Sequence, residues 1–235
     1  MSLGTFDADR AAAYDNRISR LAPGYETLHD QVVCLLGSML GDQGLSDGAH
    51  VLSVGAGTGA ELIRLGREHP SWRFTAVDPS EEMLALCRVG VQEAGLSERV
   101  TYLHGPAQAL DPSSSFDAAT SILVAHFIQD PDDRAAYFGR IAEVLSPGAP
   151  FILADLHQTT AGTFDALFDA WRRHLIWSGA PASKTETAFE DIRRGIHFAT
   201  EAELAKTLTD AGFEPPTRFF QSYLWAGWYT SRCRM

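Results

Sequence analysis

The residues with the clearest chemical potential are the glycines that follow an apolar segment near residue 50. Val51–Val54 runs directly into Gly55-Ala56-Gly57-Thr58-Gly59. Glycine lets the main chain approach a ligand closely because it has no Cβ, and exposed N–H groups at a helix start attract electronegative groups. Asp78 comes 19 residues after Gly59, and a carboxylate there can accept hydrogen bonds from both ribose hydroxyls of an adenosine. The pattern therefore predicts a cofactor site that includes an adenosine.

The glycine spacing separates two cofactor classes. Sites for dinucleotides follow the pattern G-x-G-x-x-G, in which the third glycine lets the helix pack close to the pyrophosphate. Here the pattern is G-x-G-x-G, and Ala60 stands where that third glycine would be. The spacing favours a ligand without a pyrophosphate over a dinucleotide, and over a purely structural turn.

Three polar residues near the ends of later apolar segments could transfer a proton. His126 follows the fourth predicted strand, and Asp155 and His157 follow the fifth. Histidine changes charge near neutral pH, so His126 is the first candidate for a general base. The alternatives are that His126 contacts the cofactor or packs, and that Asp155 caps a helix. His157 is a weaker candidate on the same side of an extended chain. We expect no metal site, because no third ligand stands at a suitable spacing.

The elements that must position these residues alternate between strands and helices. Short links between them indicate parallel strands with helices on both faces, a doubly wound α/β fold. The predicted strands are 50–54, 72–77, 100–104, 116–123 and 150–154, and the predicted helices between them are 61–69, 80–93 and 132–145. Ser80 is the expected N-cap of its helix.

The two ends of the chain depart from this alternation. Helices are predicted over 7–22 and 25–40 at the start, and over 160–177, 183–195 and 201–211 after Asp155, the last one capped by Thr200. Residues 217–232 are predicted to form two strands. We expect a single domain, 1–235, in which 1–45 and the insertion 158–198 cover the carboxyl ends of the strands, where ligands bind in such sheets. The aromatic residues of the insertion could be core or could line an apolar substrate pocket; they are Phe164, Phe168, Trp171, Trp177, Phe189 and Phe198.

Four segments together resemble the class I S-adenosylmethionine-dependent methyltransferases. They are Val54–Gly59, Val77–Ser80, Phe116–Ala119 and Leu145–Gly148, in this order. The resemblance implies a Rossmann-like sheet of seven strands in the order 3-2-1-4-5-7-6, with an antiparallel last strand. It implies S-adenosyl-L-methionine as cofactor and S-adenosyl-L-homocysteine as product. It also assigns contacts: Gly55, Ala56 and Gly57 at the methionine portion, Asp78 at the ribose, Pro79, Met83, Pro106 and Ala107 at the adenine, and Leu123, Val124 and His126 at the methionine end.

A narrower resemblance connects the chain with the carboxy-S-adenosylmethionine synthases, enzymes of tRNA modification. It rests on Arg20–Tyr25, Ala125–Phe127 and the tail 211–222, and it implies that Tyr25 covers the cofactor. That family has asparagine where this chain has His126. It also has an arginine for the extra carboxylate near Lys206 and Thr207. We therefore expect ordinary S-adenosylmethionine and methyl transfer to a small molecule. The alternatives are a carboxy-S-adenosylmethionine synthase-like activity and a cofactor-binding protein without catalysis.

Composition limits the partners of the chain. There are 30 acidic and 19 basic residues, for a formal charge of −11, and such a surface repels nucleic-acid backbones. No apolar run approaches the length of a membrane span, and we expect a cytoplasmic protein. Analogy with dimeric relatives allows a homodimer, with Trp225 and Trp228 at the contact.

Overall fold

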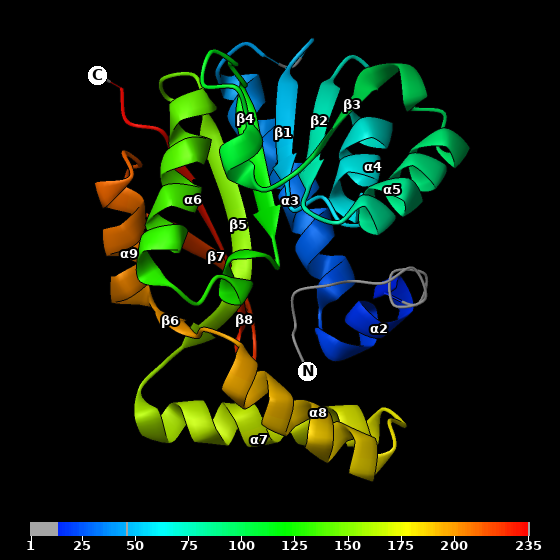
Figure 1. The fold of residues 1–235 in the computed structure, drawn as a ribbon, viewed down its shortest axis with the longest axis vertical. Coiled ribbons are helices and arrows are strands. Elements are labelled where there is room, and N and C mark those ends of the chain that lie inside the picture. Colours follow the sequence, from blue (N-terminus) through cyan, green and yellow to red (C-terminus); the bar gives the residue numbers. More distant parts are fainter. Residues whose placement is uncertain (1–13, 46, 235) are drawn as a thin grey trace.

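The computed structural model describes residues 14–45 and 47–234 (Figure 1). The first described helix, α2 (Tyr14–Leu21), is the second part of the helix predicted over 7–22. The first part of that prediction, and the start of the predicted cover 1–45, lie outside the described residues.

The fold is built around a central sheet, and its strands lie in the predicted order. The strands run in the order β3-β2-β1-β4-β5-β8-β7. β8 pairs antiparallel with β5 and with β7, while the other neighbours along this path are parallel. The strands are β1 (His50–Val54), β2 (Arg73–Asp78), β3 (Val100–His104), β4 (Ala118–Ile122), β5 (Pro150–Gln158), β7 (Thr217–Ser222) and β8 (Trp225–Ser231). The predicted order 3-2-1-4-5-7-6 is therefore confirmed; the labels differ because of one short extra strand.

Two differences concern β5 and its neighbour. The two-residue strand β6 (Ala199–Thr200) was not predicted and pairs with His157 and Gln158. β5 continues to Gln158, four residues past its predicted end, because β8 supplies partners as far as Leu156. Asp155 and His157 consequently lie inside the strand, not after it.

The helices cover both faces of the sheet because its strands are apolar on both sides. Along β1, Val51 belongs to one buried cluster and Leu52 to the other. One cluster contains residues of α3, α4 and α5, and the other contains residues of α6 and α9. These helices are α3 (Tyr25–Asp42), α4 (Ala60–Glu68), α5 (Glu81–Glu93), α6 (Pro131–Val144) and α9 (Glu201–Asp210).

Two predicted helix caps are present. The Ser80 hydroxyl accepts from the backbone N–H of Met83 at 3.3 Å, and Thr200 accepts from that of Glu203 at 3.1 Å. Each satisfies an N–H group that has no partner within its own helix.

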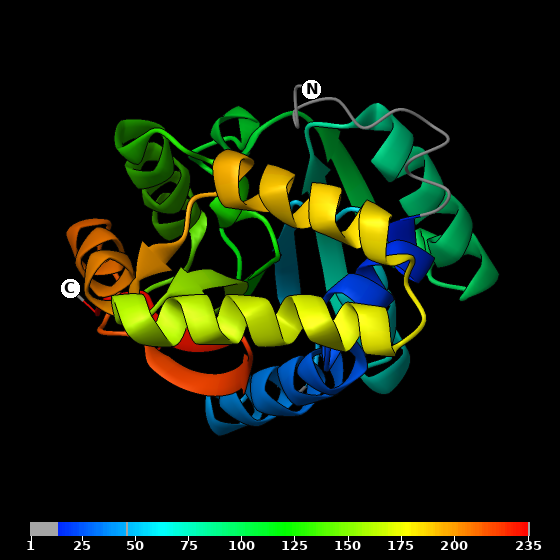
Figure 2. The same cartoon turned by 90° about the horizontal axis from the view of Figure 1, so that it is seen from below.

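Helices α7 (Ala161–Trp177) and α8 (Ala182–Gly195) form the insertion between β5 and β6. They lie below the carboxyl ends of the parallel strands in Figure 1 and cross one face of the molecule in Figure 2. The indole N–H of Trp171 donates to the carbonyl of Leu21 at 2.6 Å, which joins α7 to α2. The insertion therefore covers the sheet edge where ligands of this fold class bind.

The aromatic residues fall into different environments. Phe168, Trp171 and Phe189 are buried, whereas Trp177 is 84% exposed and belongs to no core. Trp225 and Trp228 are each 3% exposed. The prediction that these two tryptophans lie at a subunit contact is wrong, because β8 is an inner strand of the sheet and packing within the chain buries both. No described helix is long and apolar enough to cross a membrane.

Candidate functional site

The glycine loop is held by the strand beside it. The backbone N–H groups of Gly55 and Ala56 both donate to the carbonyl of Val77, at 2.7 and 3.0 Å. The N–H of Gly57 donates to Oδ2 of Asp78 at 2.9 Å. The loop and the predicted ribose-binding carboxylate, 21 residues apart in sequence, are thus in direct contact.

Asp78 is held by main-chain donors on both oxygens. Its Oδ1 accepts from the N–H of Ser80 at 2.9 Å, and its Oδ2 accepts from Gly57. Burial raises the pKa of this carboxyl above its usual range, and the two N–H donors oppose that rise. Each carboxylate oxygen has a second lone pair. Asp78 is therefore fixed in place and can still accept two ligand hydroxyls, as the ribose of an adenosine requires.

The residues predicted at the adenine gather around the same carboxylate. The backbone carbonyl of Asp78 accepts from the N–H of Gly105 at 2.9 Å, which brings the turn before Pro106 and Ala107 next to the end of β2. A Cβ at Gly57 would lie 3.3 Å from the terminal methyl of Met83. Met83 and Ala107 are buried, while Pro79 and Pro106 are exposed. Their contact with adenine stays a prediction.

Gly55 makes the closest approach in the loop. Its φ is +71°, and a Cβ there would lie 2.5 Å from Cγ2 of Val124, just after β4. The absence of a side chain lets β1 and β4 end side by side, with Val124 against the loop.

We expect the substitution Gly55→Ala to destabilise the fold by at least about 1–2 kcal/mol, the cost of a left-handed backbone for a residue with a Cβ. Thermal unfolding of the full chain measures the change. The matched control is Gly41→Ala, where no atom lies within 4 Å of the new Cβ. If both variants unfold alike, the Gly55 contact does not constrain the loop.

His126 and Asp155 form a buried dyad. Nδ1 of His126 lies 2.6 Å from Oδ1 of Asp155, and the His126 backbone N–H donates to the same oxygen at 3.2 Å. Both side chains are at most one tenth exposed. The carboxylate can only accept, so Nδ1 carries a proton, and in the neutral imidazole Nε2 carries the lone pair. This is the arrangement of an oriented base.

His157 is not part of this dyad. It lines a small cavity of about 20 Å³ behind the dyad, together with His126, Asp155 and Trp228. Its ring stands edge-on to that of Trp228 at 5.7 Å, and burial lowers its pKa. The structure does not place His157 in the large cavity described next, and we no longer propose it as a proton acceptor.

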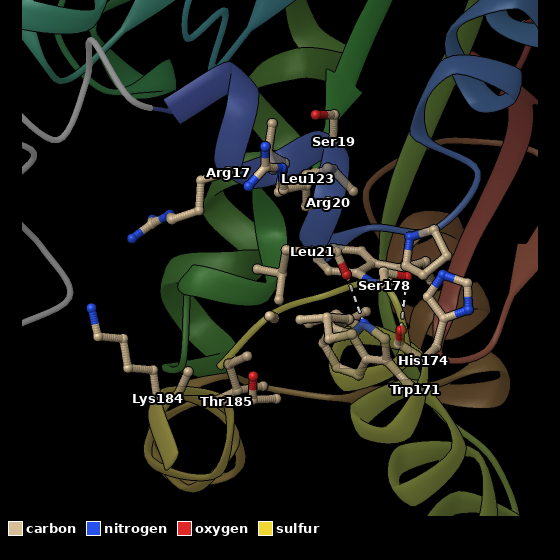
Figure 3. A pocket seen from close by; sticks show the side chains of 18 of the residues that line it. Arg17, Ser19, Arg20, Leu21, Leu123, Trp171, His174, Ser178, Lys184 and Thr185 are labelled. Atoms are coloured by element: carbon tan, nitrogen blue, oxygen red, sulfur yellow. Dashed lines mark hydrogen bonds between the residues drawn. The ribbon is translucent and has the colours of Figure 1, made fainter. Parts of the chain in front are cut away.

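A large open cavity of about 1180 Å³ lies between the dyad and the helical insertion (Figure 3). Two of the predicted cofactor residues, Leu123 and His126, line it; Tyr25, the glycine loop and Asp78 do not. Leu123 has a φ of +63°, an uncommon conformation for a residue with a Cβ that often marks functional sites. The cofactor residues and the large cavity therefore adjoin at the end of β4.

Tyr25 is buried at the start of α3. Two buried polar residues, His29 and Glu61, were missed by sequence reasoning. The Tyr25 carbonyl accepts from Nδ1 of His29 at 2.8 Å. Glu61, in the first turn of the helix after the glycine loop, accepts from the Ser53 hydroxyl at 2.6 Å. Burial raises the pKa of Glu61, and the charge of nearby His29 opposes this. Ion pairs from Arg64 to Glu26 and Asp30 join α3 to α4.

Sequence reasoning also missed several residues of the large cavity. Trp225 lines it through a ring 5.4 Å from that of Trp171. Arg17 and Arg20 line it from α2, and Lys184 from α8. The three-residue spacing of the two arginines on a predicted helix was the available signal, because it places both on one face.

Known proteins are similar to this chain in sequence. A family model described as "Methyltransferase domain" matches residues 51–148. The carboxy-S-adenosyl-L-methionine synthase of Colwellia psychrerythraea is 24% identical over 93% of this chain and 88% of its own length. The synthase of Chromohalobacter salexigens is 27% identical over 92% of this chain and 79% of its own length.

Solved structures share the fold. An O-methyltransferase family protein from Burkholderia thailandensis matches 97% of this chain with a TM-score of 0.70 and 17% identity. This chain spans 61% of that protein's length, and 59% of the length of another O-methyltransferase-like structure, from Nostoc punctiforme. The magnesium protoporphyrin IX methyltransferase of Synechocystis, with S-adenosylhomocysteine bound, matches 97% of this chain and 89% of its own length, with a TM-score of 0.63 and 16% identity.

Proposed function

We propose that this chain, whose residues 51–148 match a methyltransferase domain, is a class I S-adenosylmethionine-dependent methyltransferase that methylates a hydroxyl group of a small molecule bound in the large cavity. His126 accepts the proton of that hydroxyl, Asp155 orients His126, and Asp78 holds the cofactor ribose. Helices α7 and α8 act as the lid of a single domain.

The observation that carries this proposal is the position of the dyad. His126 and Leu123 line the large cavity, while Val124 between them would meet a Cβ at Gly55. The base therefore stands where the cofactor loop and the cavity adjoin. A hydroxyl nucleophile must lose its proton as the new bond forms, and a neutral histidine with its free nitrogen in the site can accept it.

The residues of the loop fit the cofactor. Asp78 is buried with spare acceptor capacity, and the lack of a Cβ at Gly57 leaves space beside Met83, a predicted adenine contact. When bound, S-adenosylmethionine supplies a methyl carbon activated by a sulfonium charge. The chain's share of the catalysis is then to align the acceptor and to remove its proton.

The test has a binding arm and a turnover arm. Calorimetry with S-adenosylmethionine and S-adenosylhomocysteine measures cofactor affinity, and we expect both to bind the folded chain. Incubation with a panel of phenolic and aliphatic alcohols then follows S-adenosylhomocysteine by mass spectrometry, and we expect its formation to depend on an acceptor. Failure of either ligand to bind contradicts the cofactor site. Binding without turnover on any acceptor contradicts methyl transfer and supports a binding-only protein.

A second candidate follows from the sequence relatives. The similarity to carboxy-S-adenosyl-L-methionine synthases covers more than nine tenths of this chain, which favours an enzyme that builds a carboxylated cofactor. The mass of the ligand that copurifies with the chain separates the two candidates, because a carboxylated cofactor is heavier than S-adenosylmethionine. We expect the ordinary mass; the heavier one would support the second candidate.

A further inference from the structure

Three cationic side chains line the large cavity. Arg17, Arg20 and Lys184 line it, and in Figure 3 the side chains of Arg17 and Lys184 extend toward one another from α2 and α8. None of the three forms an ion pair with any residue that the structure describes. Neighbouring arginines outside the cavity do: Arg172 pairs with Asp169 at 2.6 Å, and Arg193 pairs with Asp165 at 2.8 Å.

The carboxylates near this wall do not balance its charge. Asp191 is the one Asp or Glu among the described residues that line the cavity, and it pairs with Arg194 at 3.3 Å. Among the residues that the structure describes, three cations without an ion pair and one paired carboxylate thus line the cavity, in a chain with a formal charge of −11. A cleft lined by one sign of charge and by apolar walls concentrates ligands of the opposite sign.

Much of the remaining lining is apolar and aromatic. The rings of Trp171 and Trp225 stand edge-to-face at 5.4 Å, and Leu123 and Leu156 also line the cavity. These side chains offer an apolar surface to the body of a ligand, and aromatic rings favour contact with another ring.

We propose, resting on the methyl transfer proposed above, that the acceptor is an organic anion with an apolar, ring-bearing body. Arg17, Arg20 and Lys184 bind its carboxylate or phosphate at the outer end of the cavity. Trp171 and Trp225 contact its body.

Matched ligand pairs test the charge. The probes are benzoate and benzamide, 4-hydroxycinnamate and its amide, and 2-naphthoate and its amide, with phenyl phosphate as the phosphate arm. Calorimetry on the full chain saturated with S-adenosylhomocysteine measures each dissociation constant. In at least one pair we expect the acid to bind about tenfold more tightly than the amide, with the preference shrinking as salt is added. Tighter binding of phenyl phosphate than of benzoate supports the proposal with phosphate as the anion.

Variants test the residues. Arg17→Ala, Arg20→Ala and Lys184→Glu should each weaken binding of the preferred anion several-fold and leave its amide unchanged. Arg73→Ala is the control, because Arg73 is also exposed but stands at the start of β2, outside the cavity lining. Trp225→Leu replaces the aromatic ring by a smaller apolar side chain and should weaken acid and amide alike.

The proposal is overturned if no anion binds, if the amides bind as tightly as the anions in every pair, or if the cation variants bind like the Arg73 control. These binding results do not depend on turnover. An anion that binds but is not methylated supports the anion site and contradicts methyl transfer. Methylation of neutral acceptors alone supports methyl transfer and contradicts the anion site.

Discussion

Replacing His126 with alanine is expected to lower kcat by about 10²- to 10⁴-fold on any hydroxyl acceptor, the usual contribution of a general base. The reason is the geometry of the dyad: Nδ1 is bonded to Asp155 at 2.6 Å, which leaves Nε2 to accept a proton. Steady-state kinetics with saturating S-adenosylmethionine measures the change. The KM for the acceptor should stay within a few-fold, because a base acts mainly in the transition state.

Asp155→Asn tests the orienting half of the dyad. An amide in place of the carboxylate can donate to Nδ1 and so favour the wrong tautomer, with the proton on Nε2. We expect kcat to fall in this variant as well. The double variant should be no worse than His126→Ala alone, because the two residues act as one unit.

His50→Ala is the matched control for these variants. His50 is a half-buried histidine that bonds to Thr75 at 2.9 Å, but it stands at the start of β1, away from the carboxyl ends of the strands. It should leave kcat unchanged. If His126→Ala retains full turnover while folded, the dyad is structural, and alignment alone accounts for the catalysis.

The fold could be predicted largely because its signals are local. Alternating apolar strands and helices around the glycine loop predicted parallel strands with helices on both faces, while the order of the strands came from the family resemblance. Ser80 and Thr200 marked helix starts by their own hydrogen bonds. The contact between Gly57 and Asp78 was predictable for the same reason, since the carboxyl ends of neighbouring parallel strands share one edge.

What the sequence could not predict depends on pairing between distant segments. β5 extends to Gln158 only because β8 and β6 lie beside it. Trp225, near the end of the chain, faces the cavity because β8 is inserted next to β5. The order implied by the family resemblance already made β8 an inner strand, but no local pattern showed which of its side chains face the cavity, and its tryptophans were assigned to a subunit contact. The ion pairs from Arg64 to Glu26 and Asp30 likewise join two helices that local periodicity does not pair.

Replacing Asp78 with alanine is expected to weaken S-adenosylmethionine binding by about 3 kcal/mol, more than a hundredfold in the dissociation constant. The variant removes the acceptor for the ribose hydroxyls and leaves the N–H groups of Gly57 and Ser80 without their partner. Calorimetry with S-adenosylhomocysteine measures the loss without turnover.

Asp111→Ala is the matched control for Asp78. Asp111 accepts from the backbone N–H two residues on, at 2.9 Å, as Asp78 does from Ser80, but it is exposed and lies outside the glycine loop. This control should bind the cofactor normally. Equal affinity of the Asp78 variant and the control would reject the ribose assignment.

The pH dependence of binding gives an independent check on Asp78. Burial raises the pKa of Asp78 above its usual range, and the protonated acid accepts hydroxyls less well than the carboxylate. Affinity should therefore be fully present well above this raised pKa and be lost as the pH falls through it, at a higher pH than for an ordinary aspartate. Titrations between about pH 8 and about pH 4 measure this loss. Asp78→Asn cannot titrate, so its weaker binding should not vary over that range; if the variant keeps the same pH profile, another group carries the dependence.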